Sequence, residues 1–423
     1  MFRHLLQVVC LTNVLLFSAL CSGQHFGQAA SGSEMKSELI VNVRDFGAKG
    51  DGTRDDSAAF QKAMVHIAKS KPALLYIPPG DYRLKKRVAL DLTADGLAIR
   101  GEGQGVSNLL CDNPDGVIQI RSERLRGAIT VEQLSFFAMR QNAGTALDIT
   151  NRKRGGPGHY RNLVVQNIEM RGYGENSTFY FNRGINAYNL WRPLFLNVIF
   201  DGVYYPGMKK LKNFHADDSL LYRPDCGIQA DYCYAPSFQH CYVWCAHTGY
   251  RMISDKGTHG PEDGAFYRSF AVQCRVGMDI NTPISEPQLV IEACHLNCRD
   301  FGIKLNNRKF FHITRNLLYS EAAEEYPYVD IQISGTSYAG VVSQNIFQDP
   351  AKTNYKRLPA AVNLEHVMMQ FGHKCRNITI TGNVFNAKGR SIEIAGKPET
   401  FIIKDNQYAN PQTLKTNITT NIR

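Results

Sequence analysis

The sequence has little charge and no long apolar run beyond its first twenty positions. Charged residues make up 20% of the 423 residues, tryptophan occurs twice, and no run of Lys and Arg exceeds three residues. The missing apolar run excludes a transmembrane helix beyond the leader. The missing basic runs disfavour a nucleic-acid-binding protein. The chain also lacks the ligand spacing of a zinc finger or a calcium loop, so we expect no metal and no cofactor.

Aromatic, glycine and asparagine residues are plentiful instead. Hydrophobic residues make up 43% of the chain, and aromatic residues 10%. This composition is typical of strands and tight turns rather than of helices. The net charge of +10 and the pI of about 9.0 favour a polyanionic partner, which we expect to be an acidic polysaccharide. An ordinary solvated basic surface is the alternative.

The first 23 residues have the pattern of an export signal. A basic start at Arg3 is followed by an apolar stretch from Leu5 to Leu20 and by small residues. We therefore expect a signal peptide at 1–23, a flexible linker at 24–38, and a protein that is secreted, periplasmic or on the cell surface. Cys21 leaves lipoprotein acylation open, although Leu20 stands where a small residue is expected before such a cysteine.

A short strand motif, a small residue followed by alternating apolar positions, recurs along the chain. Its copies are GLAI, GVIQI, ALDI, GINA, GIQA, GYRM, GMDI, GIKL, DIQI, AVNL and SIEI, and from Gly227 onward they begin 22, 28, 25, 28, 31 and 30 residues apart. Second strands such as NLVVQNIEM and FFHITRNLL lie between the copies. Several strands in a repeat of about 25 residues indicate a β-solenoid, since the hairpins of a β-sandwich would leave shorter gaps. We expect this solenoid to span 39–410, followed by a tail at 411–423.

The cysteines fit the interior of such a solenoid. Two of the 11 lie in the leader, and the remaining nine are an odd number that cannot all pair within one chain. Cys245, Cys274 and Cys298 precede the motif glycines of successive coils by three or four residues. We expect them to pack in the core as small apolar side chains, with a disulfide or a zinc site as alternatives.

One segment near the start has a helical pattern. In DDSAAFQKAMVHIAKS, apolar residues recur at Ala58, Phe60, Ala63, Met64 and Ile67. This spacing predicts one amphipathic helix, N-capped at Asp55 or Asp56. Such a helix would cover the open end of the first coil.

The N-terminal motifs resemble a known superfamily. VNVRDFGAKGDGTRDDSAAFQKAM, LLYIPPGDYRL and IRGEGQG, over residues 41–105, are similar to the signature of the pectate-lyase-like superfamily, in the branch of rhamnogalacturonases, epimerase-like proteins and phage tailspikes. The resemblance implies an all-β, right-handed parallel β-helix with an N-terminal capping helix. It does not determine the reaction, because members include glycoside hydrolases, polysaccharide lyases and epimerases.

Candidate site residues follow from the register of the repeated strands. Because alternate residues of a strand point in opposite directions, positions around each motif glycine should form outward rows on successive coils. Two residues before the glycine stand Asp225, His247, Arg275 and Asp300, and two residues after it stand Gln229, Arg251, Asp279 and Lys304. Four residues after the first of these glycines stands Asp231.

These side chains suit the chemistry of an acidic polysaccharide. We expect Asp225, Asp279, Asp300 and His247 to be catalytic, with Arg251, Arg275, Lys304, Asp231 and Gln229 binding the substrate. Hydrolysis needs two carboxyl groups about 5 to 9.5 Å apart, and two coils separate Asp225 from Asp279 by about 10 Å. In a lyase, His247 or Arg275 would abstract the C5 proton of a uronate. A charge-balanced surface without catalysis is the third interpretation, that of a glycan-binding β-helix.

Known catalytic motifs of related families are absent. In the polygalacturonase family, catalytic residues stand before equivalent strands in NTD, DD and GHG motifs, and Asp225, His247 and Asp300 take similar places here. None of the three motifs is intact, and the DPHD motif of alginate epimerases is missing too. The sequence therefore favours a hydrolase acting on an acidic polysaccharide, with a lyase and a binding protein as alternatives.

Overall fold

The computed structural model describes most of the chain from Leu39 to Tyr408. The described residues are 39–68, 73–92, 96–123, 125, 127–153, 161–175, 177–203, 215–216, 218–254, 260–322, 326–348, 366–387 and 389–408. The expected signal peptide, linker and tail lie outside them. So does the strand motif AVNL at 361–364, and the strand of that coil begins only at His366.

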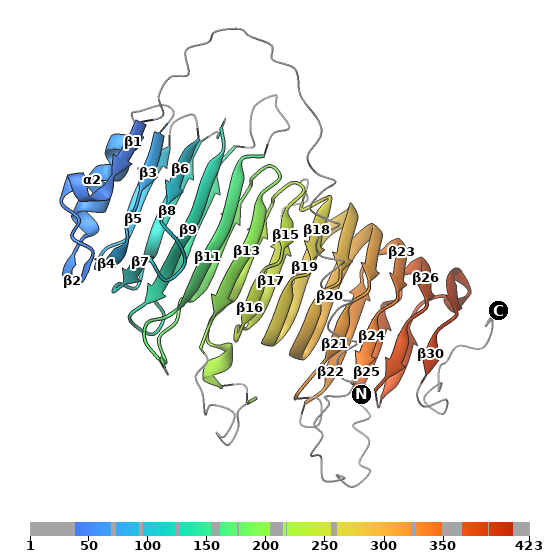
Figure 1. Ribbon diagram of the computed structural model, residues 1–423. Helices are drawn as coiled ribbons and strands as arrows, with labels where there is room; N and C mark the ends of the chain where they lie inside the picture. Colours follow the sequence, from blue (N-terminus) through green and yellow to red (C-terminus); the bar gives the residue numbers. More distant parts are fainter. Residues whose placement is uncertain are drawn as a thin grey trace, which may run out of the picture. The chain divides into compact units, whose positions relative to one another are not determined.

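Parallel strands wind into a coil with three faces, stacked from β1 to β30 (Figure 1). Every pairing between the described strands is parallel, and each strand pairs with the equivalent strand of the next coil. A crossover between parallel strands of one sheet is right-handed in almost all proteins. The fold is therefore the right-handed parallel β-helix expected from the sequence.

Face 1 carries the motif glycines. Its strands are β5 (Val88–Leu92), β8 (Gly116–Ser122), β10 (Thr145–Asn151), β12 (Arg183–Tyr188), β14 (Cys226–Asp231), β17 (Thr248–Ile253), the middle parts of β19 (Phe270–Glu292) and β20 (His295–Thr314), β22 (Tyr328–Ser334), β25 (His366–Phe371) and β28 (Arg390–Ile394).

Face 2 follows face 1 along the chain. Its strands are β1 (Leu39–Asn42), β3 (Ala73–Tyr76), β6 (Leu97–Arg100), the first parts of β9 (Ile129–Ala138), β11 (Leu163–Gly172) and β13 (Leu194–Asp201), β15 (Ser237–Gln239), β18 (Gly264–Tyr267), the last parts of β19 and β20, β23 (Tyr338–Ser343), β26 (Arg376–Thr381) and β29 (Phe401–Lys404). The motif GLAI therefore belongs to face 2, unlike the other described copies.

Face 3 completes each turn. Its strands are β2 (Asp51–Asp55), β4 (Gly80–Leu84), β7 (Ser107–Cys111), the last parts of β9, β11 and β13, β16 (Tyr242–Trp244), the first parts of β19 and β20, β21 (Leu317–Tyr319), β24 (Ile346–Gln348), β27 (Val384–Asn386) and β30 (Gln407–Tyr408). Short 3₁₀ turns lie at Val43–Phe46, Leu220–Tyr222 and Pro398–Thr400.

From β9 onward, a single residue with positive φ turns the chain from face 2 to face 3. Examples are Asn167, His240, Arg268, Ala293 and Arg315. This corner divides the predicted second strands in two, so a coil has three strands. Directly after the corner, an inward asparagine ladder ties the last coils together, with side-chain bonds of 2.9–3.0 Å joining Asn316, Asn345, Asn383 and Asn406.

A column of glycines runs along face 1 at Gly184, Gly227, Gly249, Gly277 and Gly302. A Cβ built on Gly277 would lie 2.5 Å from the carbonyl oxygen of Gly302 and 2.9 Å from the Sγ atom of Cys298. The neighbouring coil therefore leaves no room for a side chain at this position. Close packing, rather than an unusual φ, explains why the motif begins with glycine.

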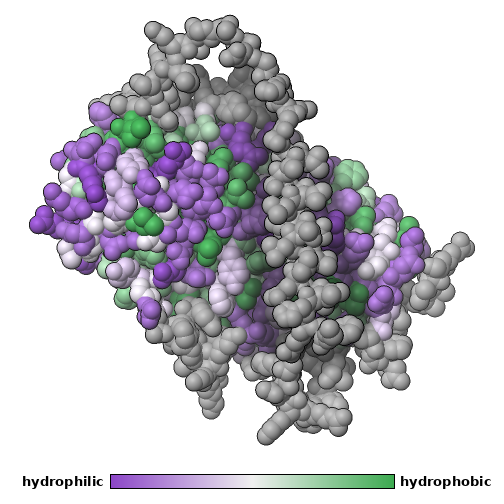
Figure 2. Space-filling model, in the orientation of Figure 1, coloured by the Kyte–Doolittle hydropathy of each residue, from purple (hydrophilic) through white to green (hydrophobic). Residues whose placement is uncertain are grey.

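The core fills the inside of the coil with aliphatic side chains, stacked aromatic rings and thiols. Phe238 stacks on Phe195 and Phe266 with ring centroids 5.0 and 4.4 Å apart. All nine cysteines among the described residues are buried and free, and Cys274 pairs in register with Cys298. The expectation of core thiols is confirmed. Figure 2 shows hydrophilic residues dominating the visible surface, with hydrophobic ones scattered among them.

Helix α2 (Ser57–Ile67) covers the first coil as expected. Phe60, Ala63, Met64 and Ile67 are buried against the adjacent strands. The Asp55 carboxylate accepts the Ser57 backbone N–H at 3.0 Å. Asp56 precedes the helix without a capping side-chain bond and instead accepts the backbone N–H groups of residues 49 and 50.

Candidate functional site

The structure brings the predicted site residues together on the outer side of face 1. Gln229, Arg251, Asp279 and Lys304 are register partners on four successive coils. Adjacent strands are about 4.8 Å apart, so each of these side chains neighbours the next. Asp225, His247, Arg275 and Asp300 stand at the turn into the same strands. We call these four residues, together with Arg183, Arg251 and Arg299, the His247 cluster.

Asp225 is held between two guanidinium groups. Arg183 of the preceding coil donates to its Oδ2 atom at 2.5 Å, and Arg251 of the following coil donates to both oxygens at 2.9 and 3.2 Å. Burial opposes ionisation, but these bonds and charges outweigh it, so the pKa of Asp225 lies below its ordinary value. Asp225 is therefore a permanent carboxylate in an ion-pair network.

Asp300, at the other end of the cluster, is also held between two guanidinium groups. Arg275 donates through Nε to Oδ2 at 2.8 Å, and Arg299 donates to Oδ1 at 2.6 Å. Arg299 is itself buried and also donates to the backbone oxygen of His215 at 2.8 Å. Both aspartates thus serve to position arginines.

His247 lies on the coil between these two networks. It is half-buried, and its Nδ1 atom is 3.1 Å from the Thr248 hydroxyl. Burial and then the positive charge of Arg275 lower the pKa of His247 below its ordinary value. The imidazole is therefore neutral at neutral pH. A neutral imidazole beside several guanidinium groups is suited to accept a proton from a bound anion.

Two residues further along the first of these strands are more buried than the sequence pattern predicted. Gln229 and Asp231 are only 8% and 5% exposed, and the Gln229 side chain donates to Asp231. Burial raises the pKa of Asp231 to about 6, although the backbone N–H of Ile253 donates to it at 3.0 Å. These two residues are less available to a substrate than the sequence pattern suggested.

Asp279 and Lys304 extend the charged surface beyond the His247 cluster. Asp279 stands in register between Arg251 and Lys304. Within the described residues, its carboxylate has no hydrogen bond or ion pair. The Lys304 ammonium lies 5.1 Å from the centre of the Phe301 ring. Cations outnumber carboxylates along this part of face 1, which favours an anionic ligand.

The sequence did not single out two arginines of this site, nor a buried aspartate on another face. Arg183 and Arg299 bind the two aspartates from positions outside the predicted rows. Asp201, on face 3, has a pKa raised to about 6 by burial and by the charge of Glu169. Only the three-dimensional pairing identifies these groups. Across the described residues, no cluster of three metal-ligating side chains occurs, and no helix could span a membrane.

Comparison with known proteins agrees with this architecture. Residues 40–184 match the family described as rhamnogalacturonase A/epimerase, pectate lyase-like. This match, over about a third of the chain, and the fold are both similar to those of pectate-lyase-like parallel β-helix proteins.

Curated relatives with this likeness are carbohydrate-active enzymes. The chain is 27% identical over 172 residues to mannuronan C5-epimerase AlgE1 of Azotobacter vinelandii, covering 37% of this chain and 12% of that protein. It is 32% identical over 134 residues to a probable rhamnogalacturonase A of Aspergillus oryzae, covering 30% of this chain and 28% of that protein. The chain thus spans well under a third of these relatives' lengths.

Solved structures share the fold at low sequence identity. The A-module of mannuronan C5-epimerase AlgE4 from Azotobacter vinelandii superposes with a TM-score of 0.61 at 16% identity, covering 90% of this chain and 98% of that one. The surface adhesin PfbA of Streptococcus pneumoniae gives a TM-score of 0.55 at 15% identity, with the same coverage. One neighbour is named an enzyme module and the other an adhesin, so the likeness concerns the fold alone.

Proposed function

We propose that the chain is an enzyme that modifies an acidic polysaccharide on face 1 by removing the proton beside a uronate carboxylate. The observation that carries this proposal is His247, a neutral half-buried imidazole between two arginine–aspartate networks. The likeness to epimerases, a lyase and a rhamnogalacturonase supports a polysaccharide as substrate.

The His247 cluster has two roles in the reaction: its arginines bind the substrate carboxylate, and its histidine accepts a proton. Arginine has five N–H donors, so Arg251 and Arg275 can bind their aspartates and still contact a substrate carboxylate. Neutralising that carboxylate acidifies the neighbouring C5–H bond, and His247 takes its proton. In elimination, the electron pair forms a C4–C5 double bond, the C4–O bond breaks, and the leaving oxygen gains a proton. In epimerisation, a proton returns to C5 from the opposite side.

Hydrolysis is the second candidate, and one observation favours it. Asp231 has a pKa raised to about 6 and so can carry the proton that a general acid needs. Its partner would be Asp279, two coils away and therefore about 10 Å or more distant, at the upper limit of the inverting geometry. Asp225, whose pKa is lowered by its arginine partners, is a poorer acid. We therefore place hydrolysis second.

The test is digestion of polyuronates by the full chain and by His247→Gln. We expect the wild type to yield unsaturated, ultraviolet-absorbing products or altered uronate stereochemistry by NMR. The rate should fall only in acid, where His247 becomes protonated, because its pKa lies below the ordinary histidine value. His247→Gln should reduce kcat by about a hundredfold or more, because the base is removed while the neighbouring arginines remain. His312→Gln, which changes an exposed histidine on face 2, is the matched control.

Other products would point to the alternatives. New reducing ends without unsaturation would support hydrolysis, and loss of activity in Asp231→Asn with retention in His247→Gln would make Asp231 the acid. Binding of polyuronates without any product would instead support a glycan-binding protein. We further propose export of the chain, on the basis of residues 1–23, which detection of the protein outside intact cells would test.

A further inference from the structure

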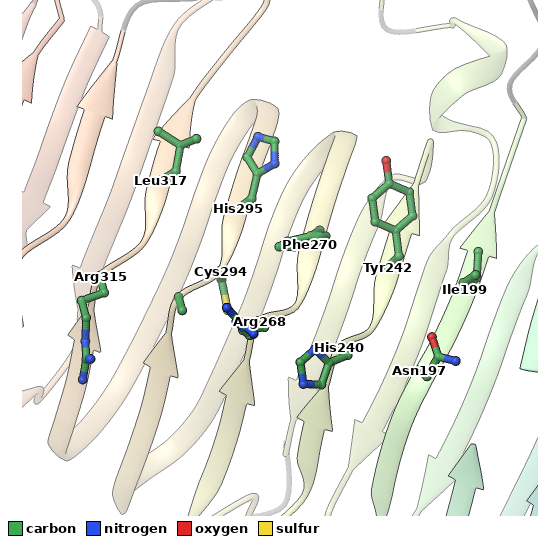
Figure 3. Close-up of a pocket in the computed structure, with 11 residues that line it drawn as sticks. Asn197, Ile199, His240, Tyr242, Arg268, Phe270, Cys294, His295, Arg315 and Leu317 are labelled. Carbon is green, nitrogen blue, oxygen red and sulfur yellow. The ribbon is translucent and has the colours of Figure 1, made fainter. Parts of the chain in front are cut away.

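An open cavity of about 680 Å³ lies at the corner between faces 2 and 3, away from the face-1 site. Figure 3 shows its side chains in two rows that run across successive coils. One row contains Ile199, Tyr242, Phe270, His295 and Leu317, and the other contains Asn197, His240, Arg268, Ala293, Cys294 and Arg315. We call this cavity the corner groove.

The first row is an aromatic strip on the outer side of face 3. Tyr242, Phe270 and His295 are register partners on successive coils. Their ring centroids are 6.0 and 5.9 Å apart, and both pairs are edge-to-face. All three are half-buried, so part of each ring remains accessible. Such a strip offers apolar surface to the C–H faces of successive sugar rings.

The second row carries two guanidinium groups, those of Arg268 and Arg315. Arg268 and His240 are exposed, and Arg268 has no ion pair within the described part of the chain. Arg315 is 61% exposed and forms an ion pair of 2.7 Å with Glu292. No aspartate or glutamate lines the groove. A ligand that combines sugar rings with negative charge is therefore complementary to both rows, whereas a neutral glycan matches only the aromatic one.

The floor of the groove is rigid. His240, Arg268 and Arg315 occupy corner positions with φ of 46° to 58°. The residues directly after them point inward and are hydrogen-bonded from coil to coil. The backbone N–H of Cys241 donates to the Ser269 hydroxyl at 3.3 Å, and that of Cys294 donates to Asn316 at 2.8 Å. This preorganisation lowers the entropy lost when a ligand binds.

We propose that the corner groove binds a stretch of anionic polysaccharide, as a second binding site separate from the face-1 centre. The class of ligand, a polysaccharide, rests on the proposed function. The charge and the aromatic strip of the groove indicate that this polysaccharide is acidic. Binding there would keep a long polymer attached to the enzyme between reactions, raising its local concentration at face 1.

The experiment measures binding by calorimetry in a full-length His247→Gln background, so that turnover does not interfere. The ligands are oligogalacturonate and oligomannuronate, with a cello-oligosaccharide of equal length as the neutral comparison. Arg268→Glu should weaken uronate binding at the groove by about tenfold, since an attractive charge becomes repulsive. Tyr242→Leu should weaken it as well, because the ring is lost while an apolar side chain remains.

The control is Lys404→Glu, which makes the same change of charge at an exposed lysine on face 2 of the last coil. If Arg268→Glu and Lys404→Glu bind the uronates equally well, or if the neutral glycan binds as tightly as the acidic ones, the proposal is wrong. Wild-type digestion tests the proposed function separately. If Arg268→Glu loses binding at the groove while the wild type forms no product, the binding proposal stands and the proposed enzymatic function is wrong.

Discussion

At the scale of single residues, the carboxyls of face 1 take different roles because their surroundings differ. Arginines hold Asp225 as a carboxylate, whereas at Asp231 burial outweighs its hydrogen bonds and the nearby arginine charges, so Asp231 retains its proton to higher pH. The alternation of strand residues was enough to predict which side chains share a face. It could not predict Arg183 or Arg299 as partners, because both stand outside the predicted rows: Arg183 lies on the preceding coil, and Arg299 directly precedes Asp300.

Asp231 should make the stability of the protein depend on pH. Its pKa is 3.8 when unfolded and about 6 when folded, so the folded state binds more protons between these values. The free energy of unfolding should therefore decrease as the pH rises through this window. Asp231→Asn removes the free-energy cost of ionising this buried carboxyl. The change should therefore raise the free energy of unfolding at neutral pH by about 1–3 kcal/mol.

Urea unfolding at several pH values measures this effect. Asp91→Asn, a change of an exposed carboxyl on the same face, is the control. An Asp231→Asn variant whose stability follows the wild-type pH profile would show that Asp231 does not titrate near pH 6.

At the scale of the strands, the repeat was visible in the sequence but the corner was not. Glycine spacing predicted the strands of face 1, since close packing requires glycine there. The turn between faces 2 and 3 uses residues such as Ala293 and Arg315, which carry no turn signal although their φ is positive. The sequence pattern therefore predicted one strand where the structure has two. The corner groove beside this turn could not be predicted either.

The glycine column should tolerate no added methyl group. In Gly277→Ala, the new Cβ would lie 2.5 Å from the Gly302 carbonyl oxygen, which forces neighbouring coils apart. We expect a loss of about 1–3 kcal/mol in the free energy of unfolding, measured by denaturant titration. Gly372→Ala, where the nearest atom is 3.4 Å away, is the matched control and should be almost neutral. Equal effects of the two changes would contradict the packing explanation.

At the scale of the whole coil, the N-terminal end needs a cover because unpaired strand edges invite association. Helix α2 supplies it, and the sequence predicted its place and its buried side, except that Ala58 is exposed. Phe60 is fully buried and packs edge-on against Tyr82 with ring centroids 5.3 Å apart. The helix thus belongs to the fold rather than to the site.

Phe60→Ala should loosen this cover. The cavity should lower the free energy of unfolding by about 3–5 kcal/mol and promote oligomers through the exposed strand edges. Size-exclusion chromatography over a range of concentrations measures the association. Val65→Ala, on the exposed side of the same helix, should leave the protein unchanged. A destabilised Phe60→Ala variant that stays monomeric would show that the helix only stabilises the first coil.

The glycine column also limits how this kind of chain can lengthen during evolution. Consecutive column glycines stand 43, 22, 28 and 25 residues apart from Gly184 to Gly302, yet all remain in one line. Extra residues are accommodated between strands, as in the segment from Gly202 to Asp225. New loops can therefore be acquired, and substrate preference changed, without altering the register of the coils, whereas an insertion within a strand would displace every coil that follows.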